Sequence, residues 1–314
     1  MDRNKISGVL FGGAVGDALG LGTEFFSKEE VLKYYPDGLN DYAQIVGDRH
    51  RSRWQTGDWT DDTDQTLCIA KAIIKDRDIV PETVAQELYA WFGDCPMGVG
   101  RHTYEVLSLS DYLQYPEKVS KLIWELSHCK SAANGAVMRT SIIGLWNRDV
   151  EQKAEEVCKL THYDPRCVGS CVIVSLLVNR LINNATISKD EIIQIGNRYD
   201  PRIQEYVELS DSSDICVLKL DDSDSIGYTL KTLSAGLWTY FNCKSFEEGL
   251  KAVIHEGGDA DTNAAVACSI LGAKFGYDSI PKHYIDGLMR KEYLSRTVEQ
   301  LTAIISNEIG HFEN

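Results

Sequence analysis

The segment GVLFGGAVGDALG, residues 8–20, indicates how the chain folds. Glycine recurs in it every four residues, at Gly8, Gly12, Gly16 and Gly20. In a helix this spacing leaves one face without side chains, and each glycine costs about 1 kcal/mol relative to alanine. Such a stripe is expected where a neighbouring backbone must approach closely. A second segment, NAAVACSILGAKFG (263–276), is apolar nearly all round, which predicts a helix buried at the centre of the molecule.

The rest of the chain also favours helices. Apolar residues recur with helical spacing in six further stretches, at 66–75, 82–92, 117–127, 151–160, 167–182 and 246–254. Long alternating runs with hairpin turns are missing, and so is the strand–helix alternation of a parallel sheet. The pattern predicts an all-α fold in a single domain covering residues 1–314. The polar and acidic stretch 198–225 is expected to be largely a surface excursion between helices.

Composition limits the classes of function. The chain has 314 residues, 43% of them apolar and 25% charged, as expected of a globular protein. Its net charge of -15 argues against a nucleic-acid partner, which requires a basic surface. The N-terminal apolar segment is too short for a membrane span and lacks a cleavage site, so no membrane association is expected. Nine cysteines without CxxC pairs predict reduced thiols in a cytoplasmic protein.

The turn TGDWTDDTDQTL, residues 56–67, contains four aspartates within seven positions. Asp62 followed by Gln65 resembles a helix N-terminal capping arrangement ahead of an apolar run. A negative charge there stabilises a helix by about 0.3–1 kcal/mol. Capping accounts for one or two of the aspartates. The others suggest either a solvated turn or a cation bound among the carboxylates.

A similar pattern occurs 200 residues later, in EGGDADTNAAVA (256–267). Asp259, Asp261 and Thr262 come directly before the helix predicted to be buried. Buried carboxylates are costly unless their charge is compensated, and Mg²⁺ and Mn²⁺ bind carboxylates and hydroxyls. Each turn alone is equally well explained by capping and solvation. The two together favour a two-metal site with bridging carboxylates.

Six motifs resemble those of the ADP-ribosylglycohydrolase family, which includes the dinitrogenase-reductase-activating and ADP-ribosyl-acceptor hydrolases. They keep the family's order along most of the chain. They are GAVGDALGLGTEF (13–25), TGDWTDDTDQTL (56–67), ANGAVMRTSIIGLW (133–146), THYDPRCVGSCV (161–172), GYTLKTLSAGLW (227–238) and GGDADTNAAVACSILGAKFG (257–276).

The resemblance implies a compact orthogonal helical bundle with a binuclear metal site in a central cleft. Mg²⁺ is the expected ion, with Mn²⁺ as an alternative. The implied ligands are Thr60, Asp61, Asp62, Asp259, Asp261 and Thr262. Asp58 and Asp64 are not ligands in this interpretation: Asp64 would lie in the first turn of the helix, and Asp58 near the metals or in solvent.

The resemblance also implies roles near the substrate. Glu24 would lie close to the scissile ribose, and Glu24 or Asp61 would act as the catalytic base. On their own, Glu24 would be interpreted as an exposed glutamate and His162 as a structural histidine. The implied substrate-binding residues are Gly98, Val99, Gly100, Ser131, Asn134, Gly135 and His162. Among them, Ser131 would offer its hydroxyl to the phosphates and His162 would contact ribose or phosphate.

The resemblance implies metal-dependent hydrolysis of the bond between ADP-ribose and a modified protein side chain, through an oxocarbenium-like state. Arginine linkage is favoured, because GDALG…E with NG-x-MR is closer to the arginine-type and bacterial members. The alternatives are a serine-linked or small-molecule conjugate, a two-metal phosphoester hydrolase and a non-catalytic ADP-ribose binder. Two features depart from some relatives: Ala132 and Ala133 replace an aromatic that stacks on adenine, and HYDPR (162–166) leaves the acceptor open.

Overall fold

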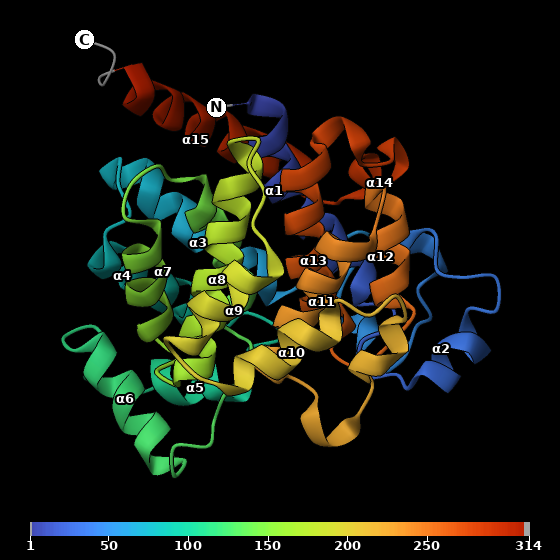
Figure 1. Ribbon diagram of the computed structural model, residues 1–314, viewed down its shortest axis with the longest axis horizontal. Coiled ribbons are helices and arrows are strands. Elements are labelled where there is room, and N and C mark those ends of the chain that lie inside the picture. The colour runs from blue at the N-terminus through green and yellow to red at the C-terminus, as the bar shows by residue number, and fades with distance from the viewer. Residues whose placement is uncertain (1, 311–314) are drawn as a thin grey trace.

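A computed structural model describes the backbone of residues 2–310 and the side chains of residues 2–305. Helices make up the fold, and no β-strand occurs within residues 2–310. The all-α prediction is therefore confirmed, as a compact orthogonal bundle (Figure 1). The α-helices are α1 Arg3–Gly20, α2 Lys28–Tyr34, α3 Asp61–Asp76, α4 Pro81–Gly93, α5 Arg101–Leu107, α6 Pro116–Leu126, α7 Val150–Lys159, α8 Pro165–Ile182, α9 Lys189–Asn197, α10 Arg202–Ser210, α11 Thr229–Asn242, α12 Phe246–Ile254, α13 Ala260–Phe275, α14 Lys282–Gly287 and α15 Lys291–Gly310.

The glycine stripe of α1 lies against the backbone of α13, as its spacing predicted. A Cβ atom placed on Gly8, Gly12, Gly16 or Gly20 would lie 2.2–2.5 Å from a carbonyl oxygen of α13. The four oxygens belong, in that order, to Gly272, Cys268, Ala264 and Ala260. Because their numbers fall as those of α1 rise, the two helices run antiparallel, side by side at the centre of Figure 1. The contact brings the C-terminal half of α1 to the N-terminus of α13.

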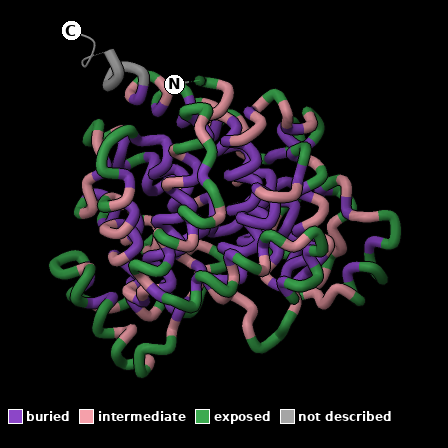
Figure 2. The backbone as a smooth tube through the Cα atoms, viewed as in Figure 1, coloured by how far each residue is buried: buried purple, intermediate pink, exposed green. Residues whose placement is uncertain are grey.

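The core surrounds α13. All of its residues from Ala260 to Ala273 are buried, and the buried part of the chain forms a continuous centre in Figure 2. The six stretches with helical spacing lie in α3, α4, α6, α7, α8 and α12, as predicted. Of these, α8 is long and apolar enough to cross a membrane by length and composition, but 78% of it is buried inside the protein. A buried core helix passes the same test, so α8 gives little support for a membrane span.

The acidic stretch 198–225 is only partly a surface excursion. Within it α10 forms a helix whose Ile203 and Val207 are fully buried, so the prediction is wrong for this part. Apolar side chains spaced four apart bury one face of a helix even where the surrounding sequence is acidic. Residues 211–225 are mostly exposed and contain only short 3₁₀ turns, as expected.

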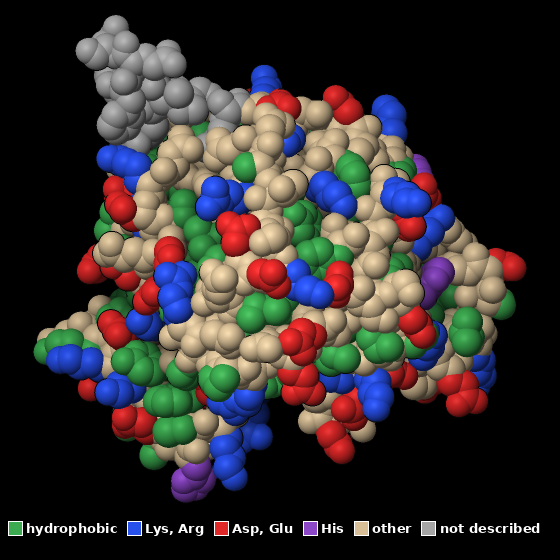
Figure 3. All heavy atoms as spheres, viewed as in Figure 1, with side chains coloured by type: hydrophobic (Ala, Val, Ile, Leu, Met, Phe, Trp, Pro, Cys, Tyr) green, Lys and Arg blue, Asp and Glu red, His purple; other side chains and the backbone are tan. Residues whose placement is uncertain are grey.

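Helix α6 projects from the body of the molecule at the lower left of Figure 1, next to α5. Hydrophobic side chains gather on the surface over them in Figure 3, and Tyr104, Leu122 and Leu126 are among the exposed ones. Residues at the ends of these two helices border the cavity described next.

Candidate active site

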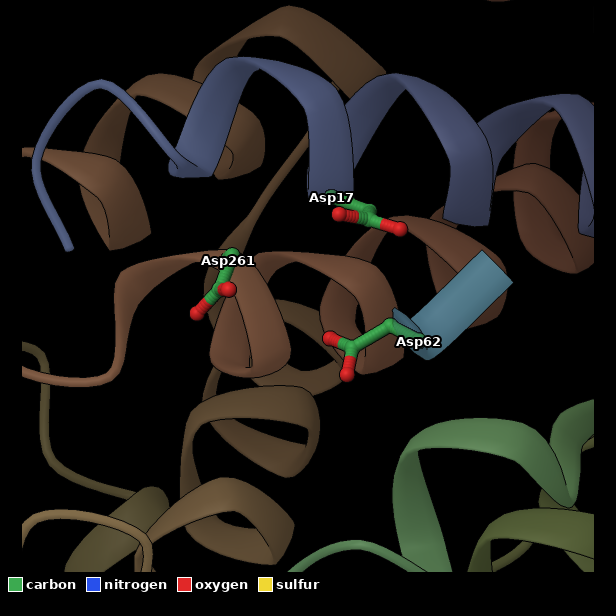
Figure 4. A group of neighbouring side chains, drawn as sticks. All are labelled: Asp17, Asp62 and Asp261. Carbon is green, nitrogen blue, oxygen red and sulfur yellow. The ribbon is translucent and has the colours of Figure 1, made fainter. Parts of the chain in front are cut away.

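Three buried aspartates converge from three different helices. Asp17 comes from α1, Asp62 from the first turn of α3 and Asp261 from the first turn of α13 (Figure 4). One carboxylate oxygen of each lies within 4.8 Å of those of the other two, close enough to share one cation. The glycine stripe contributes to this arrangement, because it lets α1 and α13 approach closely just where Asp17 and Asp261 lie.

A second acidic group adjoins the first. One carboxylate oxygen each of Glu24, Asp259 and Asp261 lies within 4.8 Å of the others. Asp261 belongs to both groups, so its two oxygens can bridge two neighbouring positions. Two carboxylate groups with a shared member have the ligand chemistry of a two-cation site for Mg²⁺ or Mn²⁺.

Asp17 also fixes the start of α3. It accepts hydrogen bonds from the backbone nitrogens of Thr60 (2.9 Å) and Thr63 (3.0 Å) and from the Thr63 hydroxyl (2.6 Å). Thr60 is the N-cap residue, and its Oγ1 lies 3.5 Å from the backbone nitrogen of Asp62. The predicted capping role of Asp62 is therefore wrong, because Thr60 and Asp17 satisfy the helix terminus instead. Asp62 is left free to face the acidic group.

The carboxylates at the start of α3 and α13 have few partners. Asp62 Oδ1 accepts from the Thr262 hydroxyl at 3.3 Å, whereas its Oδ2 is buried with no hydrogen-bond partner. Asp61 accepts from Gln65 at 2.9 Å. None of these side chains forms an ion pair with lysine or arginine in the described part of the chain. Buried charges without a counter-charge are strongly unfavourable, so a bound divalent cation fits these residues.

Burial raises the pKa of the five aspartates at the site. Repulsion by neighbouring carboxylates adds to this for all of them except Asp17. Burial is the largest cause for Asp61, Asp62 and Asp261, whose pKa values lie well above their usual range. For Asp17 and Asp259 burial raises the pKa to about 6. A cation would stabilise the ionised forms and reverse these shifts.

Asp58 and Asp64 have a different environment. Arg290 donates to Asp58 Oδ1 through Nε at 3.0 Å and to Asp64 Oδ1 through Nη1 at 3.0 Å. Its guanidinium lies over the ring of Trp59, whose indole nitrogen donates to Asp64 at 2.8 Å. Asp64 does lie in the first turn of α3, but Asp58 is paired with arginine rather than placed near the metals or simply solvated.

A glycine pair positions Asp259. Gly257 (φ +73°) and Gly258 (φ +68°) have left-handed backbones that favour glycine. A Cβ on Gly257 would lie 2.2 Å from the carbonyl oxygen of Phe26. The Phe25 nitrogen donates to the Gly258 carbonyl at 2.6 Å, and the Gly258 nitrogen donates to the Phe26 carbonyl at 2.8 Å. The loop that carries Glu24 is therefore attached directly to the loop that carries Asp259.

Glu24 is buried, not exposed, and 7% of its surface remains accessible. Its Oε2 lies 2.5 Å from Nε2 of His50, and Arg53 donates to Nδ1 of His50 at 2.8 Å. Because Arg53 donates to Nδ1, Nε2 is the ring nitrogen that donates to Glu24. Arg51 holds the same segment by donating to the Glu24 backbone carbonyl.

A cavity of about 540 Å³ opens over the two acidic groups. Its wall contains twelve of the predicted site residues, and Phe25 and His102 also line it. The predicted ones are Glu24, Asp61, Asp62, Gly98, Gly100, Ser131, Asn134, Gly135 and His162, together with Asp259, Asp261 and Thr262 from the second turn. Val99 and Thr60 are not among the residues that line this cavity. Its size suits a nucleotide-sized ligand, and many of the side chains that line it are polar.

Asn134 contacts the acidic group through its side chain. Its Nδ2 donates to Asp259 Oδ2 at 2.5 Å, and its backbone nitrogen donates to the Gly227 carbonyl at 3.0 Å. The following Gly135 borders the cavity beside His162: a Cβ there would lie 3.1 Å from the imidazole Nε2. This part of the wall offers a close approach of backbone to ligand, while the Asn134 amide orients a carboxylate.

Ser131 presents oxygen lone pairs to the cavity. Its Oγ lies 2.9 Å from Nδ1 of His102, whose Nε2 lies 3.0 Å from the Thr161 carbonyl. A carbonyl only accepts, so Nε2 carries the ring proton and Nδ1 accepts from the Ser131 hydroxyl. Burial lowers the pKa of His102, which favours this neutral form. With its proton directed at His102, Ser131 suits a ligand hydroxyl or amine better than the phosphate oxygen expected from the sequence.

His162 is 1% exposed, and its Nε2 has no hydrogen-bond partner. Burial lowers its pKa well below the usual range, so the ring is neutral near pH 7. An unpaired nitrogen in the wall of a polar cavity is a place for a ligand contact.

Sequence reasoning assigned no role to Asp17 or Arg139 and gave Gln65 only a place in the capping arrangement with Asp62, although the quoted motifs contain all three. The sequence feature that could have identified Asp17 is its charge, because it lies within a stretch of small apolar residues that was expected to pack closely. No comparable signal marked His50 or Thr161, because their partners are distant in sequence or depend on side-chain geometry.

Comparisons with known proteins identify the family and the fold. A family model described as ADP-ribosylglycohydrolase matches residues 1–309. The ADP-ribosylarginine hydrolase Tri1 of Serratia proteamaculans (strain 568) is 28% identical over 314 residues, covering 95% of this chain and 79% of that protein. An ADP-ribosyl-(dinitrogen reductase) glycohydrolase of Rhodospirillum rubrum is 25% identical over 319 residues, covering 96% and 97%. A solved structure described as an ADP-ribosylglycohydrolase-related protein complex has the same fold, with a TM-score of 0.77 at 24% identity, covering 96% and 98%.

Proposed function

The chain belongs to the ADP-ribosylglycohydrolase family, and on this basis we propose that it releases ADP-ribose from modified arginine side chains of proteins. The resemblance inferred from the six motifs is confirmed, and the chain is a hydrolase of this type. The observation that carries the proposal is the pair of carboxylate groups sharing Asp261 beneath a nucleotide-sized cavity.

Mg²⁺ is the proposed ion, because the available donors are carboxylate and hydroxyl oxygens without sulfur or imidazole. Asp17, Asp62 and Asp261 would hold one ion, and Glu24, Asp259 and Asp261 the other. Thr60, Asp61 and Thr262, also expected from the sequence, remain proposed as further ligands. When bound, the ions would supply positive charge that neutralises the carboxylates and attracts the hydroxyls of the ribose next to the scissile bond.

The residues of the cavity then have complementary tasks. Glu24 and Asp61 both line it, and either can remove the proton from the water that attacks the anomeric carbon. Neighbouring carboxylates stabilise the positive charge that develops on the ribose ring as the glycosidic bond breaks. His162 and the backbone around Gly135 lie where they can contact the ribose or diphosphate oxygens.

Phe25 supports an arginine acceptor. It lines the cavity next to Glu24, and 53% of its surface is exposed, which is unusual for a phenylalanine. A guanidinium stacks on an aromatic face and pairs with carboxylates, whereas a serine hydroxyl gains little from either. The arginine linkage of the Serratia relative points the same way.

The test is release of free ADP-ribose from arginine-linked and serine-linked peptides, with Mg²⁺, with Mn²⁺ or with EDTA. We expect release from the arginine linkage that requires Mg²⁺ and is lost in Asp261→Ala. Phe25→Ala should raise the KM for the arginine-linked peptide and leave ADP-ribose binding unchanged. Release from the serine-linked peptide alone would replace the proposed acceptor. Hydrolysis of a simple phosphoester with both peptides inert would overturn the proposal.

A further inference from the structure

Arg139 lies at the end of the 3₁₀ turn Val137–Arg139 and is fully buried. Its Nη1 donates to Gln65 Oε1 at 2.5 Å and its Nη2 donates to Thr161 Oγ1 at 2.6 Å, while Nε has no partner. No carboxylate of the described residues pairs with it. A buried guanidinium held only by an amide and a hydroxyl is costly to keep, so its placement between two parts of the active site calls for an explanation.

The first branch leads to Asp61. Because Gln65 Oε1 accepts from Arg139, the amide group must present Nε2 on its other side, where it donates to Asp61 Oδ2 at 2.9 Å. Asp61 Oδ1 lies on the cavity side, since a Cβ on Gly98 would be 3.2 Å from it. The orientation of the Gln65 amide thus leaves one Asp61 oxygen for the site.

The second branch leads to His162. Thr161 Oγ1 accepts from Arg139 and lies 2.8 Å from Nδ1 of His162. The hydroxyl proton has no other recorded acceptor among the described residues, so it is donated to Nδ1. A neutral imidazole that accepts at Nδ1 carries its proton at Nε2, the nitrogen that has no hydrogen-bond partner and lies beside Gly135 in the cavity wall. This nitrogen is therefore available to donate to a ligand.

We propose that Arg139 is a positioning residue that sets two features of the active site at once: through Gln65 the orientation of Asp61, and through Thr161 the Nε2–H tautomer of His162. The identity of the ligand oxygen that His162 meets, one of ADP-ribose, rests on the proposed function. The tautomer itself does not. One guanidinium thereby links the metal-binding end of the cavity to the substrate-binding end.

Thr161 allows a sharp test, because Thr161→Val keeps the side chain's shape and removes its hydroxyl, while Thr161→Ser keeps the hydroxyl. The ¹⁵N NMR signals of His162 should show the Nε2–H tautomer in the wild type and in Thr161→Ser, and a mixture of tautomers in Thr161→Val. Thr239→Val removes another fully buried hydroxyl, one bonded only to a backbone carbonyl in α11, and should leave His162 as in the wild type.

Affinities measured by calorimetry separate the two branches. Thr161→Val should weaken ADP-ribose binding about 10-fold or more and Thr161→Ser should restore it, while Mg²⁺ affinity stays within a few-fold. Gln65→Leu should weaken Mg²⁺ binding by about 10- to 100-fold without changing the His162 tautomer. Arg139→Lys should impair both, if it folds.

A wild-type tautomer in Thr161→Val, or no restoration by Thr161→Ser, would overturn the inference about His162. Unchanged Mg²⁺ affinity in Gln65→Leu would overturn the inference about Asp61. If the wild type released no ADP-ribose from either peptide while these tautomer and binding changes occurred, the proposed function would fail and the positioning role of Arg139 would hold.

Discussion

Two pairs of aspartates share the turn from Asp58 to Asp64, and they have opposite environments. Asp58 and Asp64 are bound by Arg290, a residue 232 positions from the first and 226 from the second. Asp61 and Asp62, which lie between them, are buried and pair with no lysine or arginine among the described residues. Two of the four aspartates in the turn therefore belong to an ion-pair network with Arg290. The other two, Asp61 and Asp62, face the cavity without a compensating positive charge.

The difference shows which acidic residues to regard as functional. A carboxylate that the fold has paired with arginine stabilises the structure, and its partner is already present. A buried carboxylate left with an unpartnered oxygen, as on Asp62, remains unfavourable until something outside the chain compensates it. The comparison predicts that mutations of the two pairs will separate activity from stability.

The largest expected effect is on Asp261, the member common to both unpaired groups. Asp261→Asn should reduce the release of ADP-ribose by more than about 100-fold, because changes to residues that merely support a metal ligand already cost 10- to 100-fold. It should not lower the melting temperature in EDTA, since it removes one of several repelling buried charges. Peptide hydrolysis and thermal melting measure the two quantities.

Asp58→Asn is the matched control on the paired side of the turn. It removes one negative charge from the same segment but none from the acidic groups, so its activity per folded molecule should stay within a few-fold of the wild type. A loss of activity comparable with that of Asp261→Asn would mean that the two pairs are not functionally distinct.

The next effect concerns the helix contact that brings Asp17 to the unpaired group. Gly16→Ala places a Cβ 2.2 Å from the backbone oxygen of Ala264, so α1 and α13 must separate. We expect a loss of about 3 kcal/mol in the free energy of unfolding, together with weaker Mg²⁺ binding. Denaturant melts and calorimetry measure these.

Gly13→Ala is the corresponding control. Its Cβ would lie 2.6 Å from the Ser269 hydroxyl, which can rotate away, rather than from backbone. This variant should retain Mg²⁺ affinity and most of the stability. Equal losses in the two variants would show that the close backbone approach of α1 to α13 at Gly16 does not determine the effect, since alanine is itself the better helix former.

Much of this arrangement can be predicted from the sequence, because it depends on local patterns. The glycine spacing of α1, the apolar α13 and the two aspartate turns each follow from a few neighbouring residues, and all four features occur as expected. Most of the site residues named from the family motifs line the cavity.

What the sequence could not show depends on distant partners and on hydrogen-bond direction. Nothing in the turn indicates that Arg290 pairs with Asp58 and Asp64, since the pairing requires the C-terminal segment to return beside α3. Asp17 is a charged residue in a largely apolar helix, and the sequence does not show that it accepts hydrogen bonds from the start of α3. The role proposed for Arg139 depends on which atoms donate and which accept in its hydrogen bonds to Gln65 and Thr161, and the sequence does not show these.

A smaller effect, on stability, is expected from the ion pairs of Arg290 with Asp58 and Asp64. Arg290→Ala leaves Asp58 and Asp64 without their cation, and both are partly buried, with side chains 16% and 25% exposed. The free energy of unfolding should fall by about 1–2 kcal/mol, between the values for surface and buried ion pairs. The kcat of the folded enzyme should change little. In the background of Asp58→Asn and Asp64→Asn, the same substitution should cost much less, which a double-mutant cycle measures.

The smallest effect is a pH dependence of the acidic groups that face the cavity, measured on the unmutated protein. In EDTA, burial raises the pKa of Asp17 and Asp259 to about 6, above the 3.8 of an ordinary aspartate. The folded state then takes up protons more readily than the unfolded state, so these groups favour folding at low pH and oppose it above pH 6. Bound Mg²⁺ keeps them ionised and removes that penalty. The increase in melting temperature caused by saturating Mg²⁺ should therefore be about 2–4 °C larger at pH 7.5 than at pH 5.5.

Comparing Mg²⁺ with EDTA at each pH isolates this effect from the buried histidines. Burial lowers the pKa of His102 and His162, which destabilises the protein at low pH, but it does so with and without the ion. Asp58→Asn should keep the wild-type difference between the two pH values, because its carboxylate has a cation within the chain. Asp261→Asn should abolish most of it. An Mg²⁺ effect on melting that is the same at both pH values would show that the unpaired carboxylates are not where the ion binds.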